Sequence, residues 1–142
     1  METRDTIRGI LEKTRTIAVY GMSKHAGKAS YWVPEYLAGK GFDIIPVNPS
    51  AGVILNRKCY PDLRSVPDRI DVVQVFRRSE EALEPVREAV ARRKDRGDVD
   101  VVWLQQGIRN EEARRLAEEN GILFVQDRCM YREWKMIHLV DG

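Results

Sequence analysis

The sequence predicts an α/β protein in which five parallel strands form a doubly wound, Rossmann-like sheet with helices on both faces. Five short runs consist almost entirely of Val, Ile, Leu and aromatic residues, which is typical of parallel strands buried on both faces. Amphipathic stretches separate most of these runs, and such alternation of β and α units favours a parallel sheet. The runs are Ile17–Tyr20, Asp43–Val47, Asp71–Phe76, Asp100–Leu104 and Ile122–Val125.

Three helices are expected around and between the first and last strands. A helix at about residues 5–13 precedes the first strand, and a helix at about 130–139 follows the last one. Another helix is predicted over residues 31–40, where Gly41 can end it.

Two further helices are predicted from capping residues. Ser79 is expected to cap one helix, because two glutamates follow it at the positive helix end. Asn110 is expected to cap the next helix for the same reason, and Gly121 to end it. Residues 48–69 contain three prolines and should form an irregular, structured loop in place of a crossover helix.

The topology follows from right-handed crossovers, and we expect the strand order 3-2-1-4-5. In such a sheet, ligands bind outside the carboxyl ends of the strands, at the point where the order reverses. The sequence therefore predicts a ligand site between the first and fourth strands.

Composition narrows the class of protein. At 142 residues the chain is expected to form a single domain, and its net charge of only +2 gives no reason to expect a nucleic-acid partner. No apolar run approaches the ~18 residues of a membrane span, and no secretory signal is apparent. Two cysteines are too few for a disulfide scaffold, which favours the reducing cytoplasm. His25 and His138 lack the spacing of a zinc site.

The most informative segment is the loop from Gly21 to Ser30, which links the first strand to a helix. Its backbone amides, the helix N-terminus, Lys24 and Lys28 form a set of groups suited to phosphate. The spacing departs from the P-loop, because Ala29 follows Lys28, and from the dinucleotide motif, because position 23 is Ser. A plain turn with both lysines in solvent is the alternative interpretation.

Polar or turn-forming residues follow every predicted strand, and together they form the candidate ligand site. No catalytic or metal-ligating set is predicted among them. The candidate binding residues are Gly21, Met22, Ser23, Lys24, Lys28, Ser30, Asn48, Pro49, Phe76, Arg77, Gln105, Gly107, Arg128 and Cys129.

These segments, in this order, resemble the single-domain coenzyme A-binding proteins, whose fold also forms the N-terminal domain of succinyl-CoA ligase alpha subunits. The resemblance covers about residues 14 to 138. The segments that carry it are IAVYGMS at 17–23, YL at 36–37, VNP at 47–49, ILNRKCYP at 54–61, VFR at 75–77, VWLQQG at 102–107 and DRC at 127–129.

The resemblance implies that coenzyme A (CoA) is the ligand and that the loop 21–30 receives its phosphates. It also implies that residues 48–49 and 75–77 flank the adenosine, and that the pantetheine arm runs toward Gln105, Gly107 and Cys129. Lys24, Lys28 and Arg77 suit the phosphate charges. Phe76 either packs on the adenine or belongs to the core.

The chain departs from the family pattern at Met22, where alanine is usual, and at Ala29, where proline is common. The ligases carry a phosphohistidine in a second domain that is not found in residues 1–142. Ligase activity is therefore not expected.

Three functions stay open on the sequence. The first is a non-catalytic module that binds CoA or an acyl-CoA as a carrier, sensor or regulator, with a protein partner or as a homo-oligomer. The second is an enzyme acting on a CoA thioester or another nucleotide, with Cys129 as its nucleophile. The third is a redox-linked binder, in which the positive charge of Arg128 favours the thiolate of Cys129 for exchange with the CoA thiol.

Overall fold

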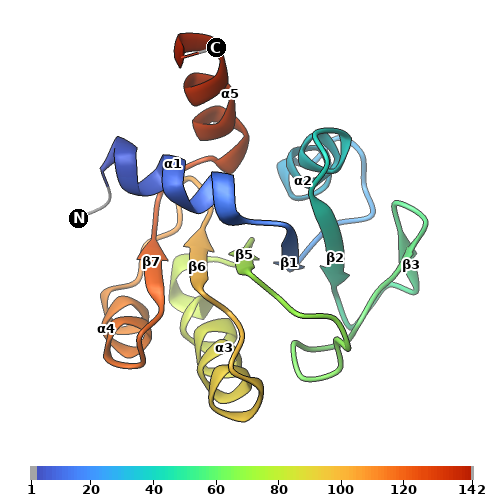
Figure 1. The fold of residues 1–142 in the computed structure, drawn as a ribbon. Helices are drawn as coiled ribbons and strands as arrows, with labels where there is room; N and C mark the ends of the chain where they lie inside the picture. Colours follow the sequence, from blue (N-terminus) through green and yellow to red (C-terminus); the bar gives the residue numbers. More distant parts are fainter. Residues whose placement is uncertain (1–2, 142) are drawn as a thin grey trace.

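The computed structural model describes residues 3–141, and its centre is a five-stranded parallel sheet (Figure 1). All five strands lie at the apolar runs, so the predicted fold class is confirmed. No helix in the described residues is long and apolar enough to cross a membrane. The strands are β1 (Thr16–Tyr20), β2 (Asp43–Val47), β5 (Val72–Val75), β6 (Val101–Leu104) and β7 (Leu123–Val125).

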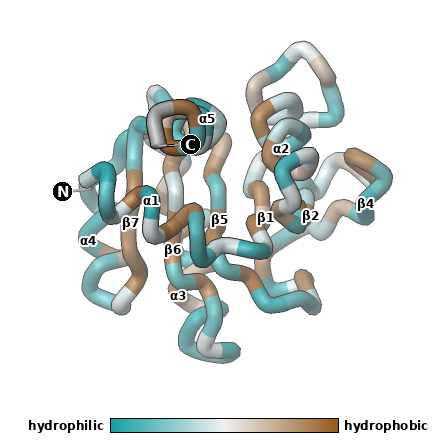
Figure 2. The backbone as a smooth tube through the Cα atoms, turned by 45° about the horizontal axis from the view of Figure 1, so that its top comes forward, coloured by the Kyte–Doolittle hydropathy of each residue, from teal (hydrophilic) through white to brown (hydrophobic). Residues whose placement is uncertain are grey.

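Helices cover both faces of the sheet. Helices α1 (Arg4–Lys13), α2 (Ala29–Gly39) and α5 (Met130–Asp141) pack on one face. Helices α3 (Leu83–Arg96) and α4 (Glu111–Glu119) pack on the other. Because both faces are buried, most successive strand residues are apolar rather than alternating, and brown sections mark β7 and β1 in Figure 2.

The strand order differs from the prediction. The sheet runs β2-β1-β5-β6-β7, which is 2-1-3-4-5 in the numbering of the five runs, not 3-2-1-4-5. The third strand pairs directly with the first, with Val73 opposite Ala18. The order therefore reverses between β1 and β5, so the ligand site expected between the first and fourth strands moves to this pair.

The crossover from β2 to β5 packs against the outer edge of β2. After β2 the chain forms a small antiparallel hairpin, β3 (Val53–Ile54) and β4 (Arg57–Lys58), within the predicted irregular loop. Tyr60 then covers the outer edge of β2, donating its N–H to the carbonyl of Pro46 (3.0 Å) and accepting from the N–H of Asn48 (2.9 Å). This bridge occupies the carboxyl end of the outer edge of β2, and β5 pairs with β1 on the other side.

A buried ion pair links α3 to this crossover, which contains no helix. Arg92 and Asp98 form a salt bridge (2.9 Å), with side chains only 2% and 4% exposed. The Arg92 guanidinium also donates to the carbonyls of Leu63 (2.6 Å), Val66 (2.7 Å) and Asp68 (2.6 Å). Every one of these acceptors lies on the crossover, which Arg96 of α3 also holds by donating to the carbonyls of Val66 (2.6 Å) and Arg64 (3.0 Å).

The Asp98 carboxylate completes the network, because it accepts the N–H of Ile70 (3.0 Å) just before β5. Leu63, Val66 and Ile70 are fully buried in the core beneath α3 and α4. The crossover thus packs its apolar side chains on the face where a crossover helix would otherwise lie.

One of the two predicted caps is confirmed. The side chain of Asn110 accepts the N–H of Ala113 (2.9 Å) at the start of α4. Ser79 is not a helix cap: it begins a short 3-10 helix, η1 (Ser79–Glu81), and α3 starts only at Leu83. The Ser79 hydroxyl instead accepts the N–H of Arg109 (3.0 Å) on the loop after β6.

The buried pair generates a stability prediction. Asp98→Ala should lower the free energy of unfolding by about 3–5 kcal/mol, because it leaves the Arg92 guanidinium buried without its countercharge. Urea denaturation measures this. Asp95→Ala removes an exposed carboxylate from α3, the helix that carries Arg92, and should leave the midpoint within experimental error. Equal midpoints for both variants would contradict the role of the pair.

Candidate ligand site at the carboxyl edge

Gly21 ends β1 in a conformation that only glycine adopts easily. Its φ is +86°, and its N–H donates to the carbonyl of Val47 at the end of β2 (2.9 Å). A Cβ atom here would collide with the carbonyl oxygen of Phe76. The glycine therefore lets the ends of β1, β2 and β5 approach closely.

The predicted glycine loop, residues 21–30, closes on the start of α2. The N–H of Ser23 donates to the carbonyl of Ser30 (3.2 Å), and the Ser23 hydroxyl accepts the N–H of His25 (3.0 Å). Lys24 and Lys28 are exposed, and Lys28 occupies the N-cap position of α2 without a side-chain cap. The first amides of a helix lack intrahelical acceptors, so this end of α2 together with two lysines suits an anion.

Arg77 lies beside the glycine loop because β5 pairs with β1. Its guanidinium sits over the ring of Tyr20, 5.4 Å from the centroid, and a Cβ at Gly21 would lie 3.6 Å from its Nε. The Tyr20 hydroxyl donates to Glu88 on α3. Burial, followed by this carboxylate, raises the pKa of Tyr20, so the ring stays neutral and offers Arg77 a fixed face.

Asn48 ties the end of β2 to the same loop. Its side-chain amide donates to the carbonyl of Met22 (2.8 Å) and accepts the N–H of Ser50 (2.8 Å). The Met22 side chain is fully buried, so Met22 can offer a ligand its backbone but not its thioether. Pro49 is exposed next to Asn48, while Phe76 packs partly on the core.

A second group of predicted residues lies at the ends of β6 and β7. Asp127, which the sequence analysis did not select, joins the two ends by accepting the N–H of Gly107 (2.7 Å). That hydrogen bond, followed by Arg109, lowers the pKa of Asp127. Its φ of +58° signals a constrained position, which a sequence does not reveal.

The side chains nearest α5 are less accessible than predicted. Gln105 and Cys129 are only 5% and 7% exposed. The Gln105 side chain accepts the N–H of Met130 at the start of α5 (3.3 Å), so it supports the helix. Arg128 pairs with Glu133 (3.3 Å), which offsets the charge expected to activate Cys129.

The structure therefore brings the predicted residues together as two adjoining groups along one edge of the sheet. The first group comprises residues 21–30, Asn48 and Arg77. The second group comprises Gln105, Gly107, Arg128 and Cys129. A groove of about 840 Å³ runs along the outer side of β7 and reaches Arg128. Within the described residues, no cluster of three or more His, Cys, Asp or Glu side chains could hold a metal ion.

Comparison with protein families identifies the kind of domain that carries this edge. The sequence model of the CoA binding domain matches residues 15–135. The chain belongs to this CoA-binding family. The match begins at Arg15, just before β1, and ends within α5, so it includes both groups of site residues.

Individual relatives resemble the chain over different shares of their own length. The chain is 36% identical over 134 residues to the uncharacterized protein YneT of Bacillus subtilis, covering 94% of this chain and 93% of YneT. A hypothetical protein from Pyrococcus horikoshii has a similar structure, with a TM-score of 0.88 and 36% identity over 99% of this chain and 94% of that one. Sixty residues are 40% identical to an ADP-forming acetate–CoA ligase of Archaeoglobus fulgidus, covering 41% of this chain but only 9% of the ligase.

The geometry of the glycine loop predicts different results for two of its glycines. Gly21→Ala should lower the free energy of unfolding by about 1–3 kcal/mol, because alanine is strained at this φ and its Cβ meets Phe76. Gly27→Ala adds a Cβ with no atom within 4 Å and should stay within about 1 kcal/mol of the wild type. Chemical denaturation compares them, and a tolerated Gly21→Ala would refute the close approach of the strand ends.

Proposed function

We propose that this CoA-binding domain binds coenzyme A or an acyl-CoA at the carboxyl edge of its sheet, with the phosphates on the glycine loop. The observation that carries the proposal is that the start of α2, with Lys28 at its N-cap, and Arg77, beside Gly21, both follow strands that meet where the strand order reverses. CoA carries a diphosphate and a 3′-phosphate, so several cationic and amide donors are needed in one place. Family membership supports the identity of the ligand.

We further propose that the domain, comprising residues 1–142, is a carrier, sensor or regulatory module rather than an enzyme. Cys129 is the nucleophile that an acyl-transfer reaction would need, and it lies in the core formed with α1, α2 and α5. Of the two histidines, His138 stacks on Trp134 at the far end of α5, and His25 lies in the exposed glycine loop. Two free, buried cysteines also suit the reducing cytoplasm proposed as its location.

Binding should depend on the two cations at the reversal point. Lys28→Ala and Arg77→Ala should each weaken CoA binding by about 10- to 150-fold, because a hydrogen bond to a charged group contributes roughly 1.5–3 kcal/mol. Isothermal titration calorimetry measures this, and dephospho-CoA and NAD should bind the wild type more weakly than CoA.

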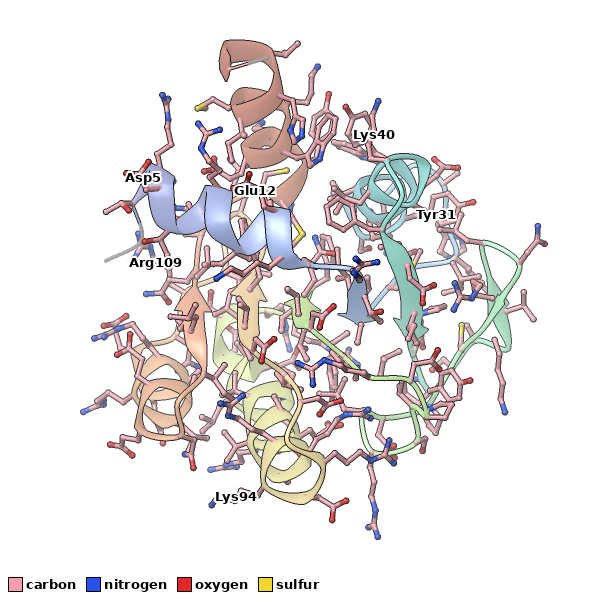
Figure 3. All side chains as sticks on the ribbon, in the orientation of Figure 1. Asp5, Glu12, Tyr31, Lys40, Lys94 and Arg109 are labelled. Atoms are coloured by element: carbon pink, nitrogen blue, oxygen red, sulfur yellow. The ribbon has the colours of Figure 1, made fainter. Side chains whose placement is uncertain are left out.

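Matched controls are available for both variants. Arg78→Ala removes the neighbouring arginine, which is 74% exposed and pairs with Glu80 and Glu81. Lys94→Ala removes an exposed lysine from α3. Figure 3 shows Lys94 at the bottom of the view and Lys40 near the top. Both controls should bind CoA as the wild type does. Tighter binding of NAD or ATP than of CoA would overturn the proposal.

The alternatives that use Cys129 lead to a separate prediction. Because the residue is 7% exposed, the folded protein should release no free CoA from acetyl-CoA and form no mixed disulfide with CoA disulfide. A thiol assay and intact-mass spectrometry test the two reactions. Turnover lost in Cys129→Ser would establish the enzyme. An adduct lost in Cys129→Ser and reversed by dithiothreitol would establish the redox-linked binder.

A further inference from the structure

Aromatic rings from α2 and α5 form a continuous row between the two helices. Ring centroids lie 5.2 Å apart for Trp32 and Tyr131, 4.6 Å for Tyr36 and Tyr131, and 5.7 Å for Tyr36 and Trp134. All three pairs meet nearly edge to face, a favourable geometry for aromatic contact. The row fixes the separation of α2 and α5.

The two ends of this aromatic row differ. At the far end, the ammonium of Lys40 lies 5.1 Å from the Trp134 ring centroid and 5.2 Å from that of Tyr36, where α2 ends beside α5 (Figure 3). At the near end, the indole of Trp32 remains 38% exposed. The row is therefore covered by a cation at one end and presents a large aromatic surface to solvent at the other.

The exposed end pairs the first turns of the two helices that follow the two groups of candidate site residues. Trp32 is in the first turn of α2, and its N–H donates to the carbonyl of Lys28 (3.0 Å). Its partner Tyr131 is in the first turn of α5, two residues after Cys129. A ligand that extends from the glycine loop toward Cys129 must pass the first turns of both helices.

We propose that Trp32, held by Tyr131, contacts the pantetheine arm of the ligand, an inference that rests on the proposed binding of CoA. The pantetheine arm carries a geminal dimethyl group and several methylenes, and these apolar groups suit an exposed indole. The phosphates stay on the glycine loop, which ends two residues before Trp32. Trp32 therefore determines affinity for the pantetheine part and not for the nucleotide part.

A comparison of two ligands tests this division. CoA and adenosine 3′,5′-bisphosphate, which lacks the pantetheine arm, are titrated into the wild type, Trp32→Ala and Trp134→Phe. Trp32→Ala should raise the Kd for CoA by roughly tenfold and leave the Kd for the bisphosphate unchanged. Trp134→Phe keeps a ring at the far end of the row and should bind both ligands as the wild type does.

The outcomes separate the two proposals. Failure of the wild type to bind CoA would overturn the proposed function itself. Wild-type affinity for CoA in Trp32→Ala would overturn only the role of Trp32, and equal weakening of both ligands would place Trp32 against the adenosine instead. Tryptophan emission provides a check independent of stability: the change on adding CoA should persist in Trp134→Phe and disappear in Trp32→Phe.

Discussion

The buried guanidinium of Arg92 holds together the part of the fold that has no helix. A guanidinium is a planar, permanently charged donor, so it can satisfy one carboxylate and several carbonyls together. Here those partners are Asp98 and three carbonyls of the crossover between β2 and β5. Burying a charge is tolerated only when it is paired and hydrogen-bonded, and Arg92 meets both conditions.

The position of this crossover decides which residues meet at the candidate site. With β5 beside β1, Arg77 lies against Tyr20 and next to Gly21. In the order expected from the sequence, β2 would separate these strands and move Arg77 about 5 Å farther from Gly21. The cationic character of the reversal point thus depends on a network on the opposite side of the sheet from α2.

Much of the fold could be predicted from the sequence, because buried parallel strands and amphipathic helices leave clear local patterns. The strand order could not, because it depends on how distant segments pack, as where Tyr60 pairs with the end of β2, and no local pattern records such contacts. Arg92 and Asp98 were also missed, since charged residues near a helix end usually face solvent. Their burial became visible only with the crossover in place.

The candidate site was predicted in part for the same reason. Gly21 and the lysines of the loop follow from the strand-loop-helix pattern, and their positions agree with it. The burial of Met22 and Cys129 could not be inferred, because a residue at a strand end can point to the core or to solvent with equal ease. Asp127 was missed because its importance lies in a contact with Gly107, twenty residues earlier in the chain.

The Arg92 network closes a chain segment of the kind that a disulfide closes in many small proteins, but by a different physical means. It joins Arg92 to Leu63, 29 residues away, and a covalent link closing a loop of that length would restrict the unfolded chain by about 3–4 kcal/mol. A guanidinium restrains only the folded chain, because its partners disperse on unfolding. The crossover is therefore held in place by hydrogen bonds and an ion pair that need no oxidation to form. A reducing agent that would cleave a disulfide leaves these interactions intact.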